Sequence, residues 1–322
     1  MADREVLVGD IGGTNARFAV SQPDGTLRDV KVLKVEDFSQ FDKALAHYIE
    51  ALSERPSVLC IASAGAKRGD EVHLTNAPWS LGESALGRQF GFAAVRIIND
   101  FEAQARFAGS MEPSDGFPLK SGKPVPGAPV LTVGPGTGFG QALFVPGHGP
   151  SSSHQVVATE GGHRLLPVRT DRELALFKRL EAKLGCPPIL EEALSGRGIV
   201  NLYHSLMQDR GEEPYPIEPP AITEAALAGP GAERDTLLWF LELLACAAAD
   251  ACFATGARGG VVVSGGIVPR ITDLIEEADF AGHFARDGIL SEYLADVPVT
   301  LITEPYAALY GTADHLRDSF RQ

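Results

Sequence analysis

Short apolar runs, separated by turn residues and by stretches of helical spacing, make up most of the chain. Apolar runs bounded by Gly, Asp or Asn are typical of strands, whereas apolar residues three and four positions apart are typical of helices. The pattern predicts strands at residues 6–9, 17–21, 31–35, 58–62, 95–98, 130–133, 141–145, 155–159, 260–264 and 299–303. It predicts helices at residues 38–52, 171–184, 195–208, 232–255 and 305–317, and one more after Pro269. Because strands and helices alternate, we expect an α/β fold with mixed sheets covered by helices.

The plan of the first hundred residues begins again in the second part of the chain. A Pro/Gly-rich stretch, residues 113–129, separates the two parts and is the expected linker or domain crossing. Each part opens with a strand, a glycine-rich turn and a second strand. The sequence therefore predicts a duplicated fold with two lobes and a cleft between them.

The two glycine-rich turns, residues 10–15 and 134–140, each carry a threonine. Glycine lets the backbone approach a ligand closely and leaves N–H groups free to hold phosphate oxygens. A strand follows each turn, whereas a dinucleotide-binding turn leads into a helix. A Walker A loop is excluded because the only Gly-Lys pair is followed by Pro124. We predict two hairpins that grip one nucleotide, with ordinary hairpin turns as the alternative.

Composition and charge limit the class of partner. The 322 residues are 44% hydrophobic and 22% charged, which is ordinary for a globular protein, and the formal net charge is −14. This charge repels nucleic acids and anionic membranes at long range, so we expect neither as a partner. An anionic substrate has to be held locally, by backbone amides or a bound metal ion.

The cysteines and the apolar segments indicate a cytoplasmic protein. The four cysteines lack metal-ligand spacing, so we expect reduced and mostly buried thiols. The N-terminal residues are charged and enter a strand at once, without the apolar core of a signal peptide. The most apolar stretch, residues 237–254, contains Glu242 and Asp250, so it reads as a buried helix rather than a membrane span. The same helix can serve an interface, and we expect a homodimer.

A candidate general base follows the strand at residues 95–98. Asn99 and Asp100 come directly after it, where side chains of an open α/β sheet project into the ligand crevice. In phosphoryl transfer a carboxylate orients the attacking hydroxyl and accepts its proton. The alternative is that Asn99 or Asp100 caps the helix that follows.

Further candidates come from three segments downstream. Glu160 and His163 flank two glycines, and both side chains can bond sugar hydroxyls, although a charged turn is an equal alternative. Glu191 is a weaker candidate, because a lone glutamate is usually solvated. Gly265 and Gly266 can let a base or ribose lie against bare backbone, or serve only the geometry of the turn.

Asp10 ends the first strand at the first glycine-rich turn. A carboxylate there can hold the water shell of Mg²⁺, an ion that keeps several waters when bound. The alternative is an aspartate that only initiates the turn.

Taken in order, these motifs resemble the bacterial glucokinase family within the actin-like ATPase superfamily. The resemblance covers nearly the whole chain and rests on residues 8–17, 74–76 with Trp79, 98–101, 134–140, 160–163, 194–196 with 201–203, and 265–270.

The resemblance implies an actin-like (ribonuclease H-like) ATPase fold with an interdomain cleft. Its smaller lobe would comprise residues 1–110 plus 304–322, and its larger lobe residues 111–303. It implies an ATP- and Mg²⁺-dependent kinase that converts glucose to glucose 6-phosphate for glycolysis. Asp100 corresponds to the general base for the 6-hydroxyl. The implied sugar-binding residues are Asn99, Asp100, Glu160, His163, Glu191 and Asn76. The implied nucleotide-binding residues are Gly9, Asp10, Ile11, Gly12, Gly13, Thr14, Asn15, Gly136, Thr137, Gly138, Gly265 and Gly266.

The sequence leaves the sugar and the phosphate donor open, and it leaves a regulator as a disfavoured alternative. The hydroxyl-binding residue types also suit another hexose, and a glycine-lined anion site suits polyphosphate as well as ATP. A sugar-sensing transcriptional regulator of related fold is disfavoured, because only nine residues precede Asp10 and the chain lacks a basic face for DNA.

Overall fold

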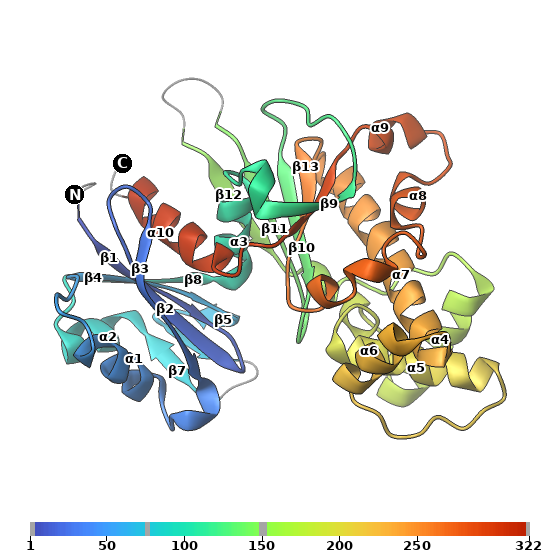
Figure 1. The fold of residues 1–322 in the computed structure, drawn as a ribbon, viewed down its shortest axis with the longest axis horizontal. Helices are drawn as coiled ribbons and strands as arrows, with labels where there is room; N and C mark the ends of the chain where they lie inside the picture. Colours follow the sequence, from blue (N-terminus) through green and yellow to red (C-terminus); the bar gives the residue numbers. More distant parts are fainter. Residues whose placement is uncertain (1–3, 75–77, 148–152, 320–322) are drawn as a thin grey trace. The chain divides into compact units, whose positions relative to one another are not determined.

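The structure is a computed structural model that describes residues 4–74, 78–147 and 153–319 (Figure 1). The chain forms two compact units. Unit 1 comprises residues 1–111 and 304–322, and unit 2 comprises residues 112–303. Each unit has its own sheet and its own core, and the chain passes between the units twice.

Unit 1 is built on a mixed five-stranded sheet in the order β3-β2-β1-β4-β8. Strands β1, β4 and β8 are parallel, whereas β1, β2 and β3 are antiparallel neighbours. A second, three-stranded sheet has the order β5-β6-β7. The elements are β1 Val6–Ile11, β2 Asn15–Ser21, β3 Leu27–Lys34, η1 Val35–Asp37, α1 Phe41–Glu50, β4 Val58–Ser63, β5 Gly65–Arg68, β6 Glu71–Leu74, β7 Ser80–Gly82, α2 Glu83–Phe90, β8 Ala94–Asn99, α3 Asp100–Ala108 and α10 Ala307–Ser319.

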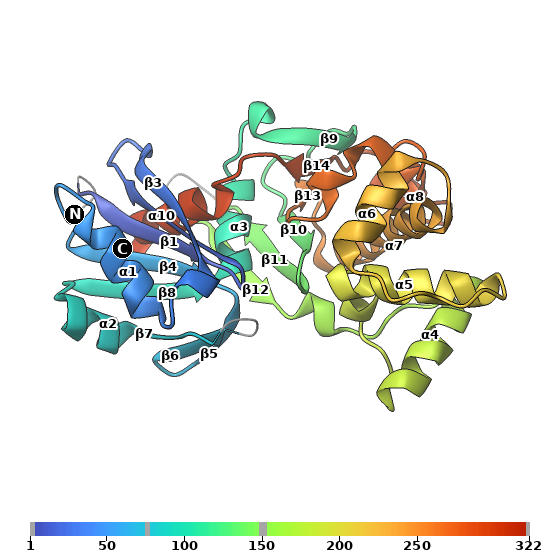
Figure 2. The same cartoon turned by 60° about the horizontal axis from the view of Figure 1, so that its bottom comes forward.

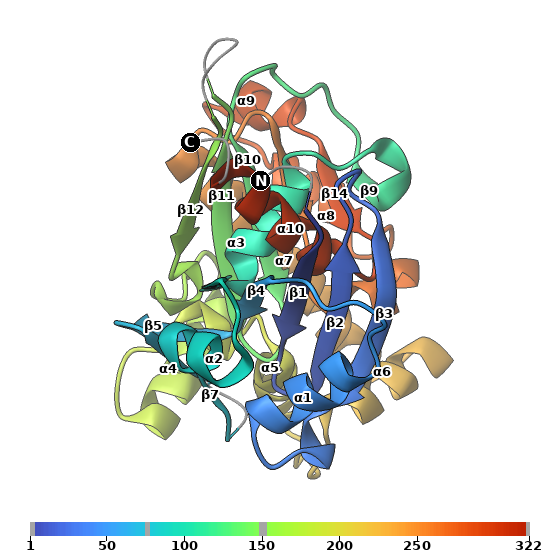
Figure 3. The same ribbon diagram turned by 90° about the vertical axis from the view of Figure 1, so that its left-hand side faces the viewer.

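Helices cover both faces of the unit 1 sheet (Figure 3). Successive side chains of a strand point to opposite faces, and β1 is buried on both. Val6 and Val8 pack with Leu309 and Leu316 of α10, whereas Leu7 packs in the cluster that contains Phe41 of α1. This two-sided burial explains why β1 reads as a continuous apolar run.

Unit 2 is built on a mixed six-stranded sheet in the order β12-β11-β10-β13-β14-β9. Its elements are η2 Pro113–Asp115, β9 Gly116–Lys120, β10 Val130–Pro135, β11 Phe139–Val145, β12 Gln155–Thr159, η3 Gly161–His163, α4 Asp171–Leu184, η4 Leu190–Glu192, α5 Gly196–Asp209, α6 Pro219–Ala228, α7 Ala232–Thr255, β13 Gly260–Val263, η5 Val268–Arg270, η6 Thr272–Leu274, α8 Phe280–Ala285, α9 Ser291–Ala295 and β14 Val299–Ile302.

The long helix α7 forms the centre of the unit 2 core, next to α5, α6 and α8 (Figure 2). Its length and composition would suffice to cross a membrane, but 72% of its apolar window is buried inside the protein. Burial on most sides explains the apolar composition and agrees with the predicted core helix. The expectation of a homodimer gains no support from α7, because Phe240, Leu244 and Ala248 on this helix are fully buried within unit 2.

The two large sheets share one strand plan. In each, an antiparallel trio (β3-β2-β1 or β12-β11-β10) is extended by two parallel strands, β4-β8 or β13-β14. The predicted α/β class with mixed sheets and the predicted duplication of the strand plan are confirmed.

One local prediction is partly right and another is wrong. The stretch at residues 113–129 begins directly after the crossing between the units, as expected, but it is more than a linker, because β9 within it pairs antiparallel with β14. Pro118 fits this strand because β9 lies at the edge of the sheet, where a missing N–H is tolerated. The helix expected after Pro269 is replaced by two short 3-10 turns, η5 and η6. Ile271 separates them with a non-helical backbone (φ −130°, ψ 23°), and the next α-helix, α8, begins at Phe280.

Candidate active site

In unit 1, Asp10 and Asn99 lie at the same edge of the sheet. Asp10 pairs with Ala62 of β4, and Ala62 pairs with Ile98 of β8, all in parallel register. Two strand spacings therefore separate Asp10 from the end of β8, a distance of roughly 10 Å. This edge holds the carboxyl ends of three parallel strands, where ligands of open α/β sheets bind.

Asn99 caps helix α3. Its Oδ1 accepts hydrogen bonds from the N–H groups of Phe101 at 2.9 Å and Glu102 at 3.3 Å. The helix-cap alternative is therefore confirmed for Asn99. Capping uses Oδ1 and leaves the amide nitrogen Nδ2 as a hydrogen-bond donor. Asp100 is the first residue of α3, and its Oδ1 accepts the N–H of Phe101 at 3.0 Å. Asp100 therefore lies at a helix N-terminus, where the helix dipole favours a negative charge.

Asp10 forms an ion pair with Arg17 across the β1–β2 hairpin. The two residues are opposite one another in antiparallel register, and Asp10 Oδ2 lies 2.8 Å from Arg17 Nη1. The Asp10 side chain is only 15% exposed, and burial raises its pKa while the charge of Arg17 opposes that shift. Arg17 is a charged partner that the sequence motifs did not indicate, although the hairpin register places it opposite Asp10.

The first glycine-rich turn is a tight hairpin tip. The Gly12 N–H donates to the Asn15 carbonyl at 3.0 Å, and the Thr14 carbonyl accepts the Val35 N–H at 3.0 Å. Thr14 is exposed, and Gly12 and Gly13 are half-buried. Two other residues predicted to bind nucleotide lie within strand β1 itself, Gly9 against the ring of Phe18 and Ile11 in the core. The tip, rather than the strand, offers accessible backbone.

In unit 2, the second glycine-rich turn joins β10 to β11. The Gly136 N–H donates to the Gly138 carbonyl at 2.8 Å, and the Gly136 carbonyl accepts the Gly196 N–H at the start of α5 at 2.9 Å. Thr137 at the tip is exposed. The turn is therefore a short hairpin tip tied by its backbone to a helix N-terminus.

The turn at Gly265 and Gly266 packs against the end of β10. Gly265 has φ +92°, and a Cβ atom there would lie 2.4 Å from the Pro135 carbonyl oxygen. Only glycine fits this conformation and this approach. Gly266 has no atom within 4 Å of a Cβ position and is exposed. Two segments more than a hundred residues apart thus meet at one end of the unit 2 sheet.

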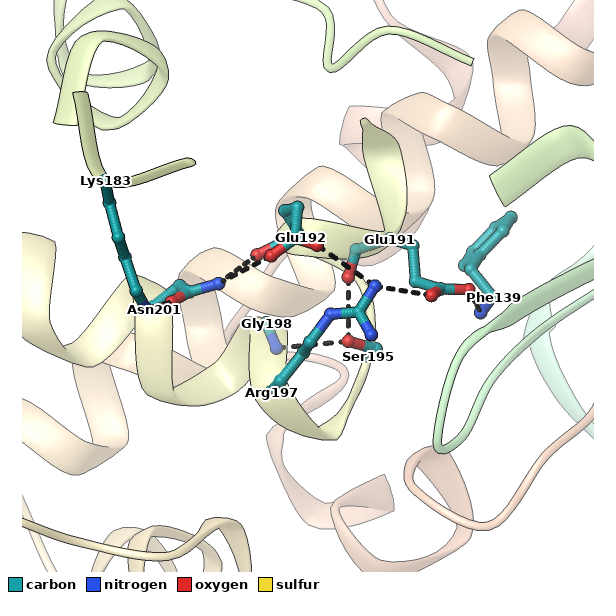
Figure 4. Close-up of polar contacts among 8 residues, drawn as sticks. All are labelled: Phe139, Lys183, Glu191, Glu192, Ser195, Arg197, Gly198 and Asn201. Atoms are coloured by element: carbon teal, nitrogen blue, oxygen red, sulfur yellow. Dashed lines mark hydrogen bonds and ion pairs between the residues drawn. The ribbon is translucent and has the colours of Figure 1, made fainter. Parts of the chain in front are cut away.

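Glu191 contacts the β10–β11 turn directly (Figure 4). Its Oε2 accepts the backbone N–H of Phe139 at 2.7 Å. A Cβ atom on Gly138 would lie 2.4 Å from the same oxygen, so glycine permits the approach. The side chain of Glu191 is 15% exposed. The alternative of a solvated surface glutamate is therefore wrong.

Arg197 lies between two carboxylates (Figure 4). Its Nη2 is 2.5 Å from Oε1 of Glu191 and 3.0 Å from Oε1 of Glu192. Ser195 caps α5 by accepting the Gly198 N–H at 3.1 Å, and it donates to the Glu191 carbonyl at 2.7 Å. The N-terminus of α5 therefore fixes η4, which carries Glu191.

Glu160 precedes the short turn η3 and His163 ends it, and this turn packs against β11 and η4. The Glu160 carbonyl accepts the His163 N–H at 3.0 Å, and both side chains are exposed. Unit 2 thus brings together the predicted segments around residues 136–138, 160–163, 191 and 265–266. Asn76, also predicted to bind the sugar, lies outside the described residues.

Two buried polar side chains beside these segments were missed. Ser63 ends β4 next to Asn99 in the unit 1 register, and it is 1% exposed. Gln141 of β11 pairs with Thr159, directly before Glu160, and is 8% exposed. Within the described residues, Ser63 Oγ and Gln141 Oε1 have no hydrogen-bond partner. Buried polar atoms are normally paired, so both atoms are candidates for a ligand contact.

The residues of unit 1 fit a magnesium ion bound through water. Asp10 supplies a carboxylate, the ligand type that Mg²⁺ prefers, at the edge that also carries the first glycine-rich turn. In the part of the chain that the structure describes, no group of three or more His, Cys, Asp or Glu could hold a metal ion. This donor set suits an ion bound mainly by water and substrate phosphates, as Mg²⁺ usually is.

Comparison with known proteins identifies the family. The family model described as glucokinase matches residues 7–319. A glucokinase from Caulobacter sp. (strain K31) is 38% identical over 311 residues, which cover 95% of this chain and 93% of the relative. A glucokinase from Chromobacterium violaceum is 36% identical over 314 residues, covering 97% and 89% of the two chains.

A solved structure supports the same family assignment. The crystal structure of a glucokinase from an Antarctic psychrotroph matches 98% of this chain and 99% of its own, with a TM-score of 0.86 and 33% identity. Relatives above 30% identity that are matched over almost their whole length share one family and one fold. The chain therefore belongs to the glucokinase family and has the actin-like ATPase fold of its sugar kinase relatives.

Proposed function

We propose that this chain transfers the γ-phosphoryl group of ATP to the 6-hydroxyl of D-glucose. Its family membership over residues 7–319 supports the reaction class. The observation that carries the assignment of roles is the placement of Asp100 at the start of α3, on the sheet edge that also holds Asp10.

Asp100 acts as the general base in this proposal. As the 6-hydroxyl oxygen attacks the γ-phosphorus, its proton passes to the Asp100 carboxylate, and ADP leaves with the electrons of the broken bond. An aspartate is a weak base in water, but a loose transition state releases the proton late. The Phe101 N–H, which is shared with Asn99 Oδ1, helps to orient the carboxylate before the sugar arrives.

The other predicted sugar residues supply donors and acceptors for the remaining hydroxyls. Asn99 offers the Nδ2 donor that its cap leaves, and Glu191 offers acceptor capacity beyond its bond to Phe139. Glu160 and His163 present exposed side chains from η3. These residues belong to both units, and their action on one sugar across an interdomain cleft stays a prediction, as does the role of Asn76.

The nucleotide phosphates are assigned to the two hairpin tips, Gly12 to Asn15 and Gly136 to Gly138, and the base or ribose to Gly265 and Gly266. A magnesium ion, when bound, neutralises phosphate charge, and Asp10 would hold it through water. Arg17 stabilises the ionised form of Asp10 by its charge. The solved ROK family glucokinase from Streptomyces griseus, a complex with glucose and AMPPNP, shares only the fold at 17% identity and a TM-score of 0.65.

We place the enzyme in the cytoplasm, where ATP is available, and we retain a homodimer as part of the proposal. Sedimentation of the purified protein tests the homodimer. A single species at the mass of one 34.2 kDa chain contradicts it.

The deciding experiment is a coupled assay of the purified chain across hexoses and phosphate donors. We expect turnover with glucose and Mg-ATP, with kcat/KM well above that for mannose, amino sugars or polyphosphate. A pocket built to bond sugar hydroxyls discriminates strongly, because a misplaced hydroxyl leaves polar groups unpaired. A higher kcat/KM with another hexose would overturn the substrate. DNA binding without sugar-dependent ATP turnover would support a regulator instead.

A further inference from the structure

Glu191 contacts the turn assigned to phosphate, although the proposed function assigns its side chain to the sugar. The family resemblance assigns its carboxylate to the sugar, yet its Oε2 accepts the N–H of Phe139 at 2.7 Å. Phe139 follows Gly136, Thr137 and Gly138 directly, and these form the turn assigned to phosphate. The Glu191 carboxylate therefore contacts the phosphate turn and can still accept a hydrogen bond from a sugar hydroxyl.

We propose that Glu191 couples the sugar site to the phosphate-binding turn, and that Arg197 is the positioning residue that holds Glu191 in place for both. This inference rests on the proposed function and adds to it the connection between the two substrates. Without Arg197, the carboxylate of Glu191 would keep only the Phe139 N–H as a hydrogen-bond donor among the residues that the structure describes.

The geometry of Arg197 supports a positioning role. Its Nη2 contacts Oε1 of Glu191 at 2.5 Å, while Oε2 takes the Phe139 N–H, so each carboxylate oxygen has one donor. Two donors on opposite oxygens fix the plane of a carboxylate. A carboxylate can accept about four hydrogen bonds, so capacity remains for a sugar hydroxyl.

Arg197 is itself held by a second set of contacts (Figure 4). The same Nη2 lies 3.0 Å from Oε1 of Glu192. The amide Nδ2 of Asn201 donates to the Glu192 carbonyl at 2.8 Å, and the Nζ of Lys183 donates to the Asn201 Oδ1 at 3.0 Å. Residues from α4, α5 and η4 therefore form one chain of contacts that ends at the Phe139 N–H.

The turn is packed too closely for Glu191 to move independently. A Cβ atom on Gly138 would lie 2.4 Å from Glu191 Oε2 and 3.0 Å from its Cδ. A shift of the carboxylate toward a sugar must therefore alter the contact with the turn, and a shift of the turn under a nucleotide must alter the carboxylate. Sites that share one contact in this way influence each other reciprocally.

The first test measures the contact without any catalysis. Amide hydrogen exchange at Phe139 is compared between the wild-type protein, Arg197→Met, Arg197→Lys and Arg234→Met. The last is a matched control, because Arg234 pairs with Glu277 elsewhere in unit 2. We expect Arg197→Met to speed exchange at Phe139 about tenfold, Arg197→Lys to speed it less, and Arg234→Met to leave it unchanged.

The second test measures the coupling itself by calorimetry of the same proteins. The dissociation constant of glucose is measured with and without ADP, and that of ADP with and without glucose. We expect each ligand to lower the dissociation constant of the other in the wild-type protein. Arg197→Met should reduce the factor by which each dissociation constant falls by at least threefold. Arg197→Lys should restore part of it, because Lys keeps the charge but lacks the guanidinium fork.

The outcomes separate this inference from the proposed function. Unchanged Phe139 exchange in a folded Arg197→Met protein, or undiminished coupling, overturns the inference even if glucose is phosphorylated. Faster exchange and lost coupling support it. If the wild-type protein binds both ligands but transfers no phosphate, the proposed function fails while the exchange result still stands. Thermal unfolding shows whether Arg197→Met is folded, and if it is not, Arg197→Lys decides both measurements.

Discussion

Gly311 of α10 lies directly against the backbone of Ala103 in α3. A Cβ atom on Gly311 would approach the Ala103 carbonyl oxygen to 1.9 Å, which no side chain can do without moving a helix. The α3 helix begins with Asp100, the proposed general base. The distance between these two helices therefore sets where the base is held.

Replacing Gly311 with alanine should destabilise the protein by about 1–3 kcal/mol, the usual cost of overpacking a tight contact. Gly87→Ala is the matched control, because Gly87 also lies within a unit 1 helix but its nearest atoms would be 3.8 Å from a Cβ. That control should stabilise the protein by up to about 1 kcal/mol, since alanine favours helix. Chemical denaturation measures both. Equal effects of the two substitutions would contradict the close packing of α3 and α10.

Asp100→Asn should lower kcat by a factor of about 10² to 10⁴, the usual contribution of a general base. The KM for glucose should change less, because the amide still bonds the hydroxyl. Steady-state kinetics with glucose and Mg-ATP measure both values. Asp37→Asn, at an exposed aspartate of the same unit, is the control and should have no effect. Near-wild-type turnover of Asp100→Asn would remove Asp100 from the mechanism.

Glu102, two residues after Asp100, ties α3 to α10 through a hydrogen bond to His315 Nδ1 at 3.0 Å. Burial raises the pKa of Glu102, but His315 and Arg106 outweigh it, so the pKa is lowered from its ordinary value of 4.5. A lowered pKa in the folded state stabilises the protein above pH 4.5, and this stabilisation is lost as the pH falls through the folded-state value.

Glu102→Gln should therefore lower the free energy of unfolding by about 1.5–3 kcal/mol at pH 7, the range for a hydrogen bond to a charged group. The difference from the wild-type protein should shrink as the pH falls below 4.5. Urea denaturation at a series of pH values measures this. Glu36→Gln, at an exposed glutamate, is the control and should show no such dependence. If the difference in the free energy of unfolding between the wild-type protein and Glu102→Gln grew as the pH fell, the contact between Glu102 and His315 would be refuted.

The cysteines should fall into two classes of reactivity. Cys186 is exposed, whereas Cys60, Cys246 and Cys252 are buried, and burial raises the pKa of each of these three thiols, that of Cys252 to about 11. A thiol reagent at neutral pH should modify one thiol rapidly in the native protein and the others only after unfolding. Cys186→Ser should abolish the rapid phase. Rapid reaction of that variant would show that a second thiol is accessible.

The elements that the sequence predicted best are those whose pattern is local. The helices α4 and α7 and the strand β12 have the predicted bounds, because the sequence pattern that defines each lies within or next to the element. The α4 helix, for example, begins after Thr170, whose side chain accepts the Glu173 N–H, and ends at Gly185 in the left-handed conformation. Caps of this kind are visible in a sequence.

The missed elements depend on partners distant in the sequence. Strands β5, β6 and β7 are three or four residues long, too short for a clear alternation, and form a sheet only with one another. The helices α8 and α9 are six and five residues long. The longer helix α6 begins with two prolines, residues that are also common in loops. Such segments are stabilised by tertiary packing rather than by local propensity.

The sequence indicates candidate site residues where chemistry coincides with a strand end or a glycine turn, as at Asp100 and Gly136 to Gly138, and their roles stay predictions. The site was not predictable where a residue acts through a partner. Arg17 could have been found from the register of the first hairpin, because it lies opposite Asp10. Arg197 had no such signal, since its contact with Glu191 joins a 3-10 turn to the start of a different helix.

The shared strand plan of the two units also allows their first hairpins to be compared position by position. Asp10 is the fifth residue of the six-residue β1, and Gly134 is the fifth residue of the six-residue β10. Arg17 lies opposite the first, and Gly140 lies opposite the second. One copy therefore carries an ion pair where the other carries two glycines. The two hairpins therefore offer different chemistry at the same place in the plan: in unit 1 a carboxylate paired with a guanidinium, and in unit 2 backbone dipoles alone.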